Sequence, residues 1–487
     1  MTERTHYTTG RLNKSLPHHL QELVYPTGNE AAKVKECDLY AKIDRAHISM
    51  LLKCGLVTHD WAKDHLEKIA DLEREQYASL LSMSTPRGFY MLWENYLEEE
   101  DTSFAHLGRS RNDLNATLAR LQMRTAIHDV LMEGLDIIEL IQSMAHVNTK
   151  TTMAGYTHGQ PAMPITFGHQ LLAWGFAISR EMNVVLQALN NNEAACPLGA
   201  GAQGGTNLPI DAAYTAQLLG FERAAFNSLD AVADRSFLIH AAAAASGLAC
   251  VISRVCQDLL FYASPQVNYV YFDDELCGAS SMMPHKRNPY LCEIVAGKMN
   301  SIIGKWNYAI TTLSGTPYSN TARATEVLQE VLDGLEKTRK GLILFSAILN
   351  GLHPNFEKML ATAEDYYTCS TALANELVTK AGYAFRQAHR LVGEWVSKAE
   401  NHRQSFAEIV QSECRERGIN INFGILSPDN AMLAAEYGGG PGTMSVEFQT
   451  KQLNTKRLGI KNEVTAHTTR WKAADELLEE TVSRVCN

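Results

Sequence analysis

The sequence predicts an all-α protein organised around a bundle of long helices. Apolar residues recur every three or four positions along several stretches of twenty or more residues, the period of a helix with one buried face. The alternation of apolar and polar residues that strands require is rare and short. Packing side by side in a bundle is the arrangement that buries such helices together.

The first helices are predicted over residues 31–80, with a short turn near Gly55–Thr58. A long amphipathic helix is predicted from Asp113 to Lys150. Further long helices are predicted at 164–195, 230–264, 289–314 and 324–350.

Domain boundaries are predicted near residue 110 and near Pro354. They divide the chain into an N-terminal helical domain (1–110), a central long-helix bundle (111–354) and a C-terminal helical domain (355–487). Turn-rich segments at 196–211, 277–289 and 437–442 separate the helices, and long loops of this kind often carry function.

Composition narrows the class of protein. The chain has 487 residues, of which 45% are hydrophobic, enough for a large buried core. A formal net charge of −10 argues against nucleic-acid binding. The most apolar stretch, Ala241–Ala263, contains Arg254 and Asp258, so we expect a buried helix and no membrane span.

The ten cysteines are scattered from Cys37 to Cys486, without a C-x-x-C pair or a His/Cys ligand spacing. This usage predicts reduced thiols in a cytoplasmic protein, with neither a disulfide framework nor a zinc site. Residues 1–16 lack the apolar core of a secretory signal.

Three segments place polar and cationic residues beside glycines: HLGRSRNDLNAT (106–117), GYTHGQPAMP (155–164) and GASSMMPHKRNP (278–289). In the third, Ser280 and Lys286 precede a helix that is predicted to begin near Pro289. Backbone N–H groups at a helix N-terminus, with a lysine nearby, favour an anion. A serine in this place could equally serve only as a helix cap.

The third segment is similar to the S-S-x-M-P-x-K-x-N-P signature of the fumarase/aspartase superfamily. The first resembles the H-T-G-R-S-R-N-D stretch, and the second the G-Y-T-H-x-Q stretch, of the argininosuccinate lyase branch. PLGAGAQGGT (197–206), NSLDAVADR (227–235) and the glycines of 437–442 resemble further stretches in the same order, so the similarity covers about residues 35 to 445.

The resemblance implies a three-domain helical fold whose central helices join into the core of a homotetramer. Each active site would be shared by three subunits, and each subunit would supply one of the three segments. The substrate would be a small dicarboxylate, and no cofactor or metal would be needed. The reaction implied is a β-elimination that releases fumarate, in which a base removes a proton beside a carboxylate and the site stabilises the resulting negative charge.

The resemblance also implies roles for individual residues. Ser280 would be the base, and Lys286 and Asn288 would bind the carboxylate that carries the intermediate's charge, with Ser281 and Met283 also at the substrate.

In the second segment Thr157 and His158 would contact the substrate or assist proton transfer, with Glu293 as the partner of the histidine and Gln160 lining the site.

In the first segment Arg111 and Asn112 would grip the far carboxylate, which suits the planar fork of arginine. Ser110 would be a further contact. Arg109 and Asp113 are expected to be scaffold, as an ion pair or a cap.

The sequence departs from the branch at several positions. Asp44 stands where the branch has a substrate-binding serine, Tyr90 where it has a histidine, and Leu107 where it has a threonine. Asp44 and Tyr90 are therefore expected to bind the substrate. Asp44 could pair with a cationic amine on the leaving group, or be an ordinary exposed helix residue.

The largest departure follows Gly315. There, Asn320, Thr325 and Leu328 replace the tyrosine, glutamine and lysine that bind the arginine moiety in the branch. Of the three, Asn320 is expected still to contact the substrate. Loss of all three polar anchors argues against tight binding of argininosuccinate.

These observations predict a fumarate-releasing carbon–nitrogen lyase acting on an N-substituted aspartate other than argininosuccinate, in either direction. Diamine, hydrazine and amino-acid adducts are the candidates. The alternatives are argininosuccinate lyase itself, a carbon–oxygen or carbon–sulfur lyase of the same superfamily, and a non-catalytic structural tetramer.

Overall fold

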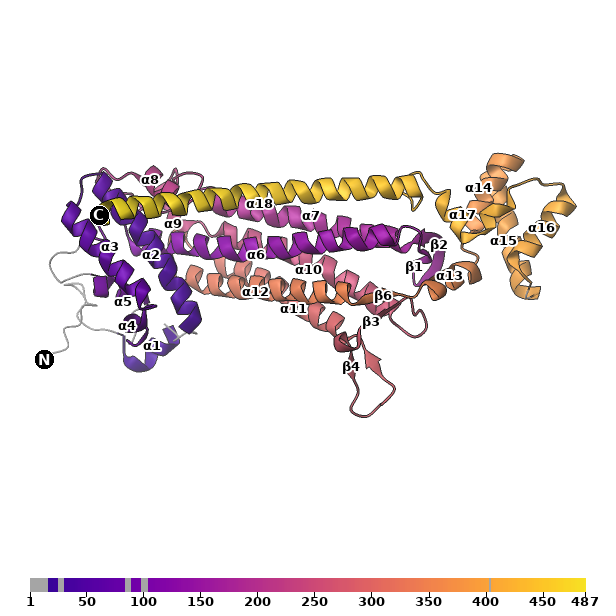
Figure 1. Cartoon of the computed structure of the whole chain (residues 1–487), viewed down its shortest axis with the longest axis horizontal. Helices are drawn as coiled ribbons and strands as arrows, with labels where there is room; N and C mark the ends of the chain where they lie inside the picture. The colour runs from indigo at the N-terminus through magenta and orange to yellow at the C-terminus, as the bar shows by residue number, and fades with distance from the viewer. Residues whose placement is uncertain (1–15, 25–29, 84–88, 98–103, 403) are drawn as a thin grey trace.

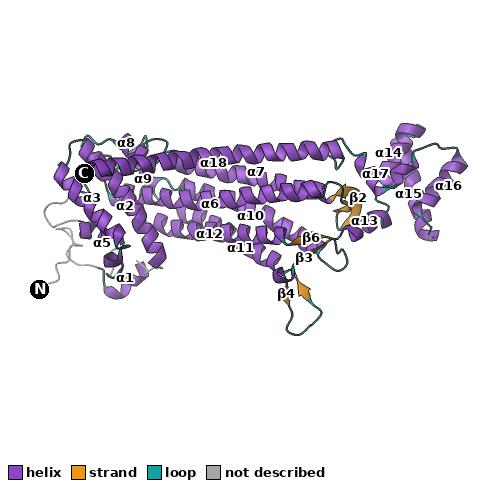
Figure 2. Ribbon diagram, in the orientation of Figure 1, coloured by secondary structure: helices purple, strands orange, loops and turns teal. Residues whose placement is uncertain are grey.

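The computed structural model describes residues 16–24, 30–83, 89–97, 104–402 and 404–487. Residues 1–15, in which no secretory signal is predicted, lie outside the described part. Figure 2 shows helices throughout the molecule and strands only in short two-stranded pairs. The chain is 72% helical, and the all-α prediction is confirmed.

The centre of the molecule is an elongated bundle of long helices lying side by side (Figure 1). The predicted long helices are all present, with ends within a few residues of those expected. The bundle helices are α6 (Arg111–Val147), α7 (Phe167–Glu193), α10 (Ser236–Tyr262), α11 (Tyr290–Ser314), α12 (Ala322–Asn350) and α18 (Thr443–Cys486). Close approach of α6 and α7 depends on Gly134, where a Cβ would lie 2.3 Å from the Met182 Sδ.

The N-terminal helices form a head at one end of the bundle (Figure 1). They are α1 (His18–Val24), α2 (Glu30–Lys53), α3 (His59–Arg74), α4 (Ala78–Leu81) and α5 (Phe89–Leu97), with α8 (Ala212–Leu218) and α9 (Ser228–Ala233) nearby. The predicted turn between α2 and α3 is present, and Thr58 caps α3 by accepting a hydrogen bond from the Trp61 N–H. A hydrophobic core around Trp93 holds the head together.

Beyond the other end of the bundle lies a second cluster of short helices. It comprises α13 (Phe356–Asp365), α14 (Ser370–Ala381), α15 (Phe385–His402), α16 (Phe406–Arg417) and α17 (Pro428–Leu433), with a 3-10 turn at Phe423–Leu426 between the last two. Leu373, Leu377 and Trp395 belong to a separate small core within this cluster.

Helix α18 leaves that cluster and runs back along the whole bundle to the head (Figure 1). Its first half packs into the bundle core through Leu453 and Ile460, and its end packs into the head core through Leu478 and Val482. The packing therefore divides 355–487 in two, whereas the sequence analysis assigns it to one C-terminal domain.

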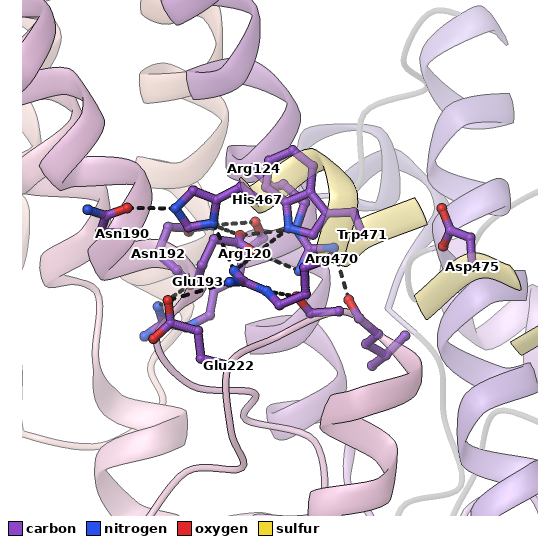
Figure 3. Close-up of polar contacts among 12 residues, drawn as sticks. Arg120, Arg124, Asn190, Asn192, Glu193, Glu222, His467, Arg470, Trp471 and Asp475 are labelled. Atoms are coloured by element: carbon purple, nitrogen blue, oxygen red, sulfur yellow. Dashed lines mark hydrogen bonds and ion pairs between the residues drawn. The ribbon is translucent and has the colours of Figure 1, made fainter. Parts of the chain in front are cut away.

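A buried polar network fastens α18 to the bundle (Figure 3). Glu193 at the end of α7 is fully buried and pairs with Arg124 of α6, with Nη2 to Oε2 at 2.8 Å. Trp471 of α18 donates from Nε1 to the same Oε2 at 2.8 Å, and Asn192 donates to Oε1 at 2.9 Å. The carboxylate has donors on both oxygens, which is what its burial requires.

Three two-stranded antiparallel sheets complete the fold. The pairs are β1 (Thr152–Thr157) with β2 (Gln160–Thr166), β3 (Val270–Phe272) with β6 (Leu352–Pro354), and β4 (Gly278–Ala279) with β5 (Arg287–Asn288). The first lies at the end of the bundle opposite the head, and the third projects from the side of the bundle (Figure 1).

The apolar helix predicted around Ala241–Ala263 is α10. Among the described residues it is the one helix long and apolar enough to cross a membrane, and more than half of its most apolar stretch is buried inside the protein. Its buried face carries small residues such as Ala242 and Ala245 within the bundle core. This burial favours a core helix.

Candidate active site

The first segment is anchored to the head by a buried arginine. Arg109 has a side chain 1% exposed, and its Nη1 lies 2.6 Å from the Asp44 Oδ1. Its Nη2 donates to the Tyr90 hydroxyl at 2.8 Å, and Trp93 donates from Nε1 to the other Asp44 oxygen at 2.8 Å. Burial works to lower the pKa of Arg109, but Asp44 and Tyr90 outweigh it and raise that pKa above the ordinary value. The expected scaffold role of Arg109 is confirmed.

The structure corrects the expectation for Asp44 and Tyr90. Asp44 is 2% exposed, and both of its oxygens are occupied within the chain, so it is neither an exposed helix residue nor open to a leaving group. Tyr90, at 5% exposed, turns its hydroxyl to Arg109. The third departure lies beside them, since His47 Nε2 is 3.0 Å from the Leu107 carbonyl oxygen. Two of the three departures from the branch, Asp44 and Tyr90, thus bond to one guanidinium.

The first turn of α6 fixes the next residues. The Ser110 hydroxyl accepts from the Asn112 N–H at 3.3 Å, and the Asp113 Oδ1 accepts from the Ser110 N–H at 2.8 Å, which together form a capping box. The other Asp113 oxygen accepts from the N–H groups of Gly199 and Gly201, each at 2.9 Å. The expected cap role of Asp113 is confirmed, and Ser110 serves as the N-cap.

Arg111 and Asn112 leave this turn with different surroundings. Arg111 is exposed, and it has no ion pair within the described residues. Asn112 donates to the Ala202 carbonyl at 3.1 Å and accepts from the Asn320 Nδ2 at 2.9 Å. The turn between α11 and α12 therefore meets the first segment directly.

The two other departures that follow Gly315, Thr325 and Leu328, lie on α12 and have different surroundings. Leu328, where the branch has a lysine, packs against the hydrophobic core of the bundle. Thr325 is exposed on the first turns of α12. Neither presents the polar anchor that the branch has at its position.

The second segment is a tight hairpin. Thr157 pairs with Gln160, so that His158 and Gly159 form the two-residue turn between β1 and β2. Their φ angles are +53° and +72°, and two positive values are typical of the type I′ turn that joins twisted strands. All four of these residues are exposed at the tip.

The third segment is the hairpin of β4 and β5, and Ser280 opens its loop. The Ser280 Oγ accepts hydrogen bonds from the N–H groups of Met282 at 3.3 Å and Met283 at 3.0 Å. Ser281 and Lys286 are exposed on the same loop. Two backbone donors aimed at one hydroxyl oxygen favour negative charge on that oxygen.

The base of this hairpin is held to the bundle by Arg287. Its Nη2 donates to the Phe272 carbonyl and lies 2.6 Å from the Asp274 Oδ1. Asn288 is half-buried on β5, and Glu293 is exposed in the first turn of α11.

One chain does not bring the three segments together. Arg111 and Asn112 lie at the head end of α6, and His158 lies past its other end (Figure 1). A helix of 37 residues is about 55 Å long. The hydrogen bonds of the Ser280 hairpin are made to its own loop and to Phe272. Within the described residues, no group of three His, Cys, Asp or Glu side chains is placed to hold a metal.

Arg235 has no role predicted from the sequence, but the structure places it beside Asn320. It is the last residue of the 227–235 stretch, and its Nη2 lies 3.5 Å from the Asn320 Oδ1. The signal that identifies Arg235 is three-dimensional, because Asn320 also bonds to Asn112 of the first segment.

Models of known protein families match two parts of the chain. A family described as "Lyase" matches residues 82–304, and one described as "Argininosuccinate lyase C-terminal" matches residues 367–432. An argininosuccinate lyase from Acinetobacter baylyi is 35% identical over 368 residues, covering 75% of this chain and 77% of the relative. One from Chromohalobacter salexigens is 34% identical over 402 residues, covering 81% and 86%.

Solved structures with the same fold include an EDDS lyase in complex with formate. It superposes with a TM-score of 0.82 over 97% of both chains at 24% sequence identity. A class II fumarase from Schistosoma mansoni superposes with a TM-score of 0.68, covering 87% of this chain and 98% of the fumarase at 17% identity. At these identities the likeness establishes the fold.

Proposed function

Because the chain belongs to the argininosuccinate lyase branch of the fumarase/aspartase superfamily, we propose that it cleaves an N-substituted aspartate other than argininosuccinate. Fumarate-forming carbon–nitrogen cleavage is the chemistry that its relatives support. The proposal adds the class of substrate, and the reaction can run in either direction.

The observation that carries the proposal is the fate of the three positions that hold arginine in the branch. Leu328 is packed against the bundle core, Thr325 is a short exposed side chain, and Asn320 is bonded to Asn112. An arginine moiety in this place would lose the hydroxyl, amide and ammonium partners that the branch supplies. Each unpaired polar group in a site of this kind costs affinity, so a different leaving group is favoured.

In the proposed reaction, Ser280 acts as the base. It removes the proton from the carbon beside the carboxylate that Lys286 and Asn288 would hold, and the electron pair left behind forms the carbon–carbon double bond as the carbon–nitrogen bond breaks. The nitrogen keeps the bonding pair and takes one proton, so the products are fumarate and a free amine. The N–H groups of Met282 and Met283 stabilise the serine alkoxide.

The remaining residues of the three segments would bind and orient the substrate. Lys286 and Asn288 would hold the carboxylate that gains charge in the intermediate, and Arg111 with Asn112 would hold the other. The proton for the amine would come through the second segment. Its residues are Thr157, His158 and Gln160, with Glu293 as the partner of the histidine. Ser281 and Met283 would contact the substrate from the Ser280 loop.

A complete site in this proposal needs three subunits of a homotetramer. The head end of one chain, the His158 hairpin of another and the Ser280 hairpin of a third would meet. Support comes from the length of α6, which separates the first segment from the second by about 55 Å within one chain. The projection of the Ser280 hairpin away from its own bundle favours the same assembly (Figure 1).

Argininosuccinate lyase activity itself is the second candidate. The observation in its favour is the 35% identity to argininosuccinate lyases over three quarters of the chain. It would require an arginine site built from other residues than those at 320, 325 and 328.

The deciding experiment follows the ultraviolet absorbance of the fumarate double bond. Purified protein is incubated with fumarate and a panel of amines that includes arginine, ammonia, diamines, hydrazine and common amino acids. Consumption of fumarate with one of these amines but not with arginine would support the proposal. Consumption with arginine alone would restore argininosuccinate lyase, and no consumption with any amine would reject both.

A further inference from the structure

The strongest unassigned feature near the proposed site is the guanidinium of Arg235, which is half-buried between α9 and α10. Its Nη1 donates to the carbonyl oxygens of Val232 at 3.2 Å and Asp234 at 2.6 Å. Its Nη2 faces the Asn320 Oδ1 at 3.5 Å. These acceptors are all neutral, so in the described part of the chain Arg235 forms no ion pair.

The acidic groups around Arg235 are already occupied. The neighbouring Asp234 carboxylate lies 2.7 Å from Arg120 and accepts from the Ser236 N–H at 2.8 Å. Asp230 accepts a hydrogen bond from the Tyr318 hydroxyl. Burial and the Arg120 charge both lower the pKa of Arg235 from its ordinary value. Within the described residues, no carboxylate lies within ion-pair distance of this guanidinium.

Arg235 is connected to the first segment through hydrogen bonds. Its partner Asn320 donates from Nδ2 to the Asn112 Oδ1 at 2.9 Å. Arg111 immediately precedes Asn112 in the chain. Asn320 stands where the branch has a residue that binds the leaving group. Asn320 therefore joins Arg235 to Asn112, and a leaving group that reaches past Asn320 would meet Arg235.

The charge of this region also disfavours one class of leaving group. The Asp44 carboxylate that replaces the branch serine is neutralised by Arg109 at 2.6 Å. A second ammonium on a diamine would meet Arg111 and Arg235, and Asp44 could not offset that repulsion. Like charges in a partly desolvated site repel strongly.

We propose that Arg235 binds a carboxylate carried by the leaving amine, so that the substrate is the adduct of fumarate with an amino acid. The planar guanidinium can hold a carboxylate through two parallel hydrogen bonds, which explains the choice of group. The inference rests on the proposed function and narrows its substrate class from any amine to amines that bear a negative charge.

The test compares amines of equal length with and without the carboxylate. β-Alanine is matched with propylamine, and γ-aminobutyrate with butylamine, in the fumarate consumption assay. The amino acid of each pair is expected to have a KM lower by about tenfold or more. In Arg235→Gln the amine KM of the amino acids should rise by a similar factor, while the KM for fumarate stays unchanged.

Two further variants control for charge and for folding. Arg223→Gln removes the same charge from an exposed arginine that lies over the Phe226 ring, and it should change neither KM. Arg235→Lys should recover part of the amino-acid preference. An Arg235→Gln protein that melts earlier and loses kcat with every amine alike would show a structural role and overturn the inference.

The outcomes separate this inference from the proposed function. If uncharged amines or diamines react better than their amino-acid partners, the inference fails and the proposed function stands. If only arginine consumes fumarate, or if no amine does, the proposed function fails and the inference fails with it.

Discussion

Two groups of polar residues on this chain differ in burial and in the partners they have. Arg109 and Asp44 in the head are 1% and 2% exposed, and each is bonded on more than one atom. Lys286 and Ser280 lie on a projecting hairpin, where Lys286 is exposed and the Ser280 oxygen meets only backbone N–H groups. Buried charges that are paired hold a shape, whereas charges left open remain free to bind a ligand.

The polar network of α18 belongs with the head in this comparison (Figure 3). Glu193 is 0% exposed and its oxygens are shared among Arg124, Asn192 and Trp471. The Glu193 carboxylate is therefore not available to a substrate. Changes in the buried groups should therefore act on stability, and changes in the hairpin on turnover.

The largest effect is expected for Ser280→Ala. Loss of the base should lower kcat by on the order of 10³-fold. The melting temperature should hardly move, because the side chain is only partly buried and bonds only to its own loop. Steady-state kinetics and a thermal melt measure the two quantities, with Ser412→Ala, at an exposed serine of α16, as the control that should change neither. Retention of turnover by Ser280→Ala would remove Ser280 as the base.

Asp44→Asn is expected mainly to lower the stability of the folded protein. Without the carboxylate, the buried Arg109 loses its counter-charge, which should cost about 3–5 kcal/mol of unfolding free energy. Asp475→Asn is the matched control, because Asp475 is about half exposed in its pair with Lys42 and should cost at most about 1 kcal/mol. Denaturant unfolding at one fixed protein concentration measures both. Equal costs would mean that the buried pair is not a structural anchor.

The sequence was sufficient for the helices, because a buried face repeated over twenty or more residues has a single period to detect. The return of α18 was not predictable, since it depends on packing of Leu453 and Leu478 against helices far away in sequence. The end of the second strand of the His158 hairpin was not predicted, because the following helix was expected to begin at 164 and begins at Phe167.

The site could be predicted only as separate segments. Motif residues such as Ser280 and Asn112 were found by resemblance, but the pairing of Asp44 with Arg109 joins residues 65 positions apart. Asp44 therefore looked like a free carboxylate beside the substrate. Arg235 was overlooked because its meaning depends on Asn320, which reaches it only in the folded chain.

Trp471→Phe should have a smaller effect within the α18 network. It removes one N–H donor from the buried Glu193 carboxylate and keeps the aromatic bulk, which should cost about 1–2 kcal/mol. Trp306→Phe is the matched control, since the Trp306 N–H is buried and has no hydrogen-bond partner among the described residues. Denaturant unfolding compares the two. An equal cost for both would mean that the Glu193 hydrogen bond adds nothing to the attachment of α18.

The smallest effect concerns pH and tests the head network through His47. Burial, and then the Arg109 charge, lower the pKa of His47 well below its ordinary value. The unfolded chain therefore binds a proton below about pH 6.5 that the folded chain does not, and stability falls as the pH drops through that value.

The loss should approach about 1.4 kcal/mol per pH unit for this one histidine. His65, His169 and His467 also have lowered pKa values, so the total slope is shared among several groups. The measurement is the difference between the wild type and His47→Gln in unfolding free energy, from about pH 7.5 to about pH 5.5. The variant should be less stable at the upper pH, where it lacks the bond to Leu107, and should lose less stability on acidification. Parallel curves would show that His47 accepts its proton in the folded head beside Arg109, which would contradict the burial of its ring as the cause of the lowered pKa.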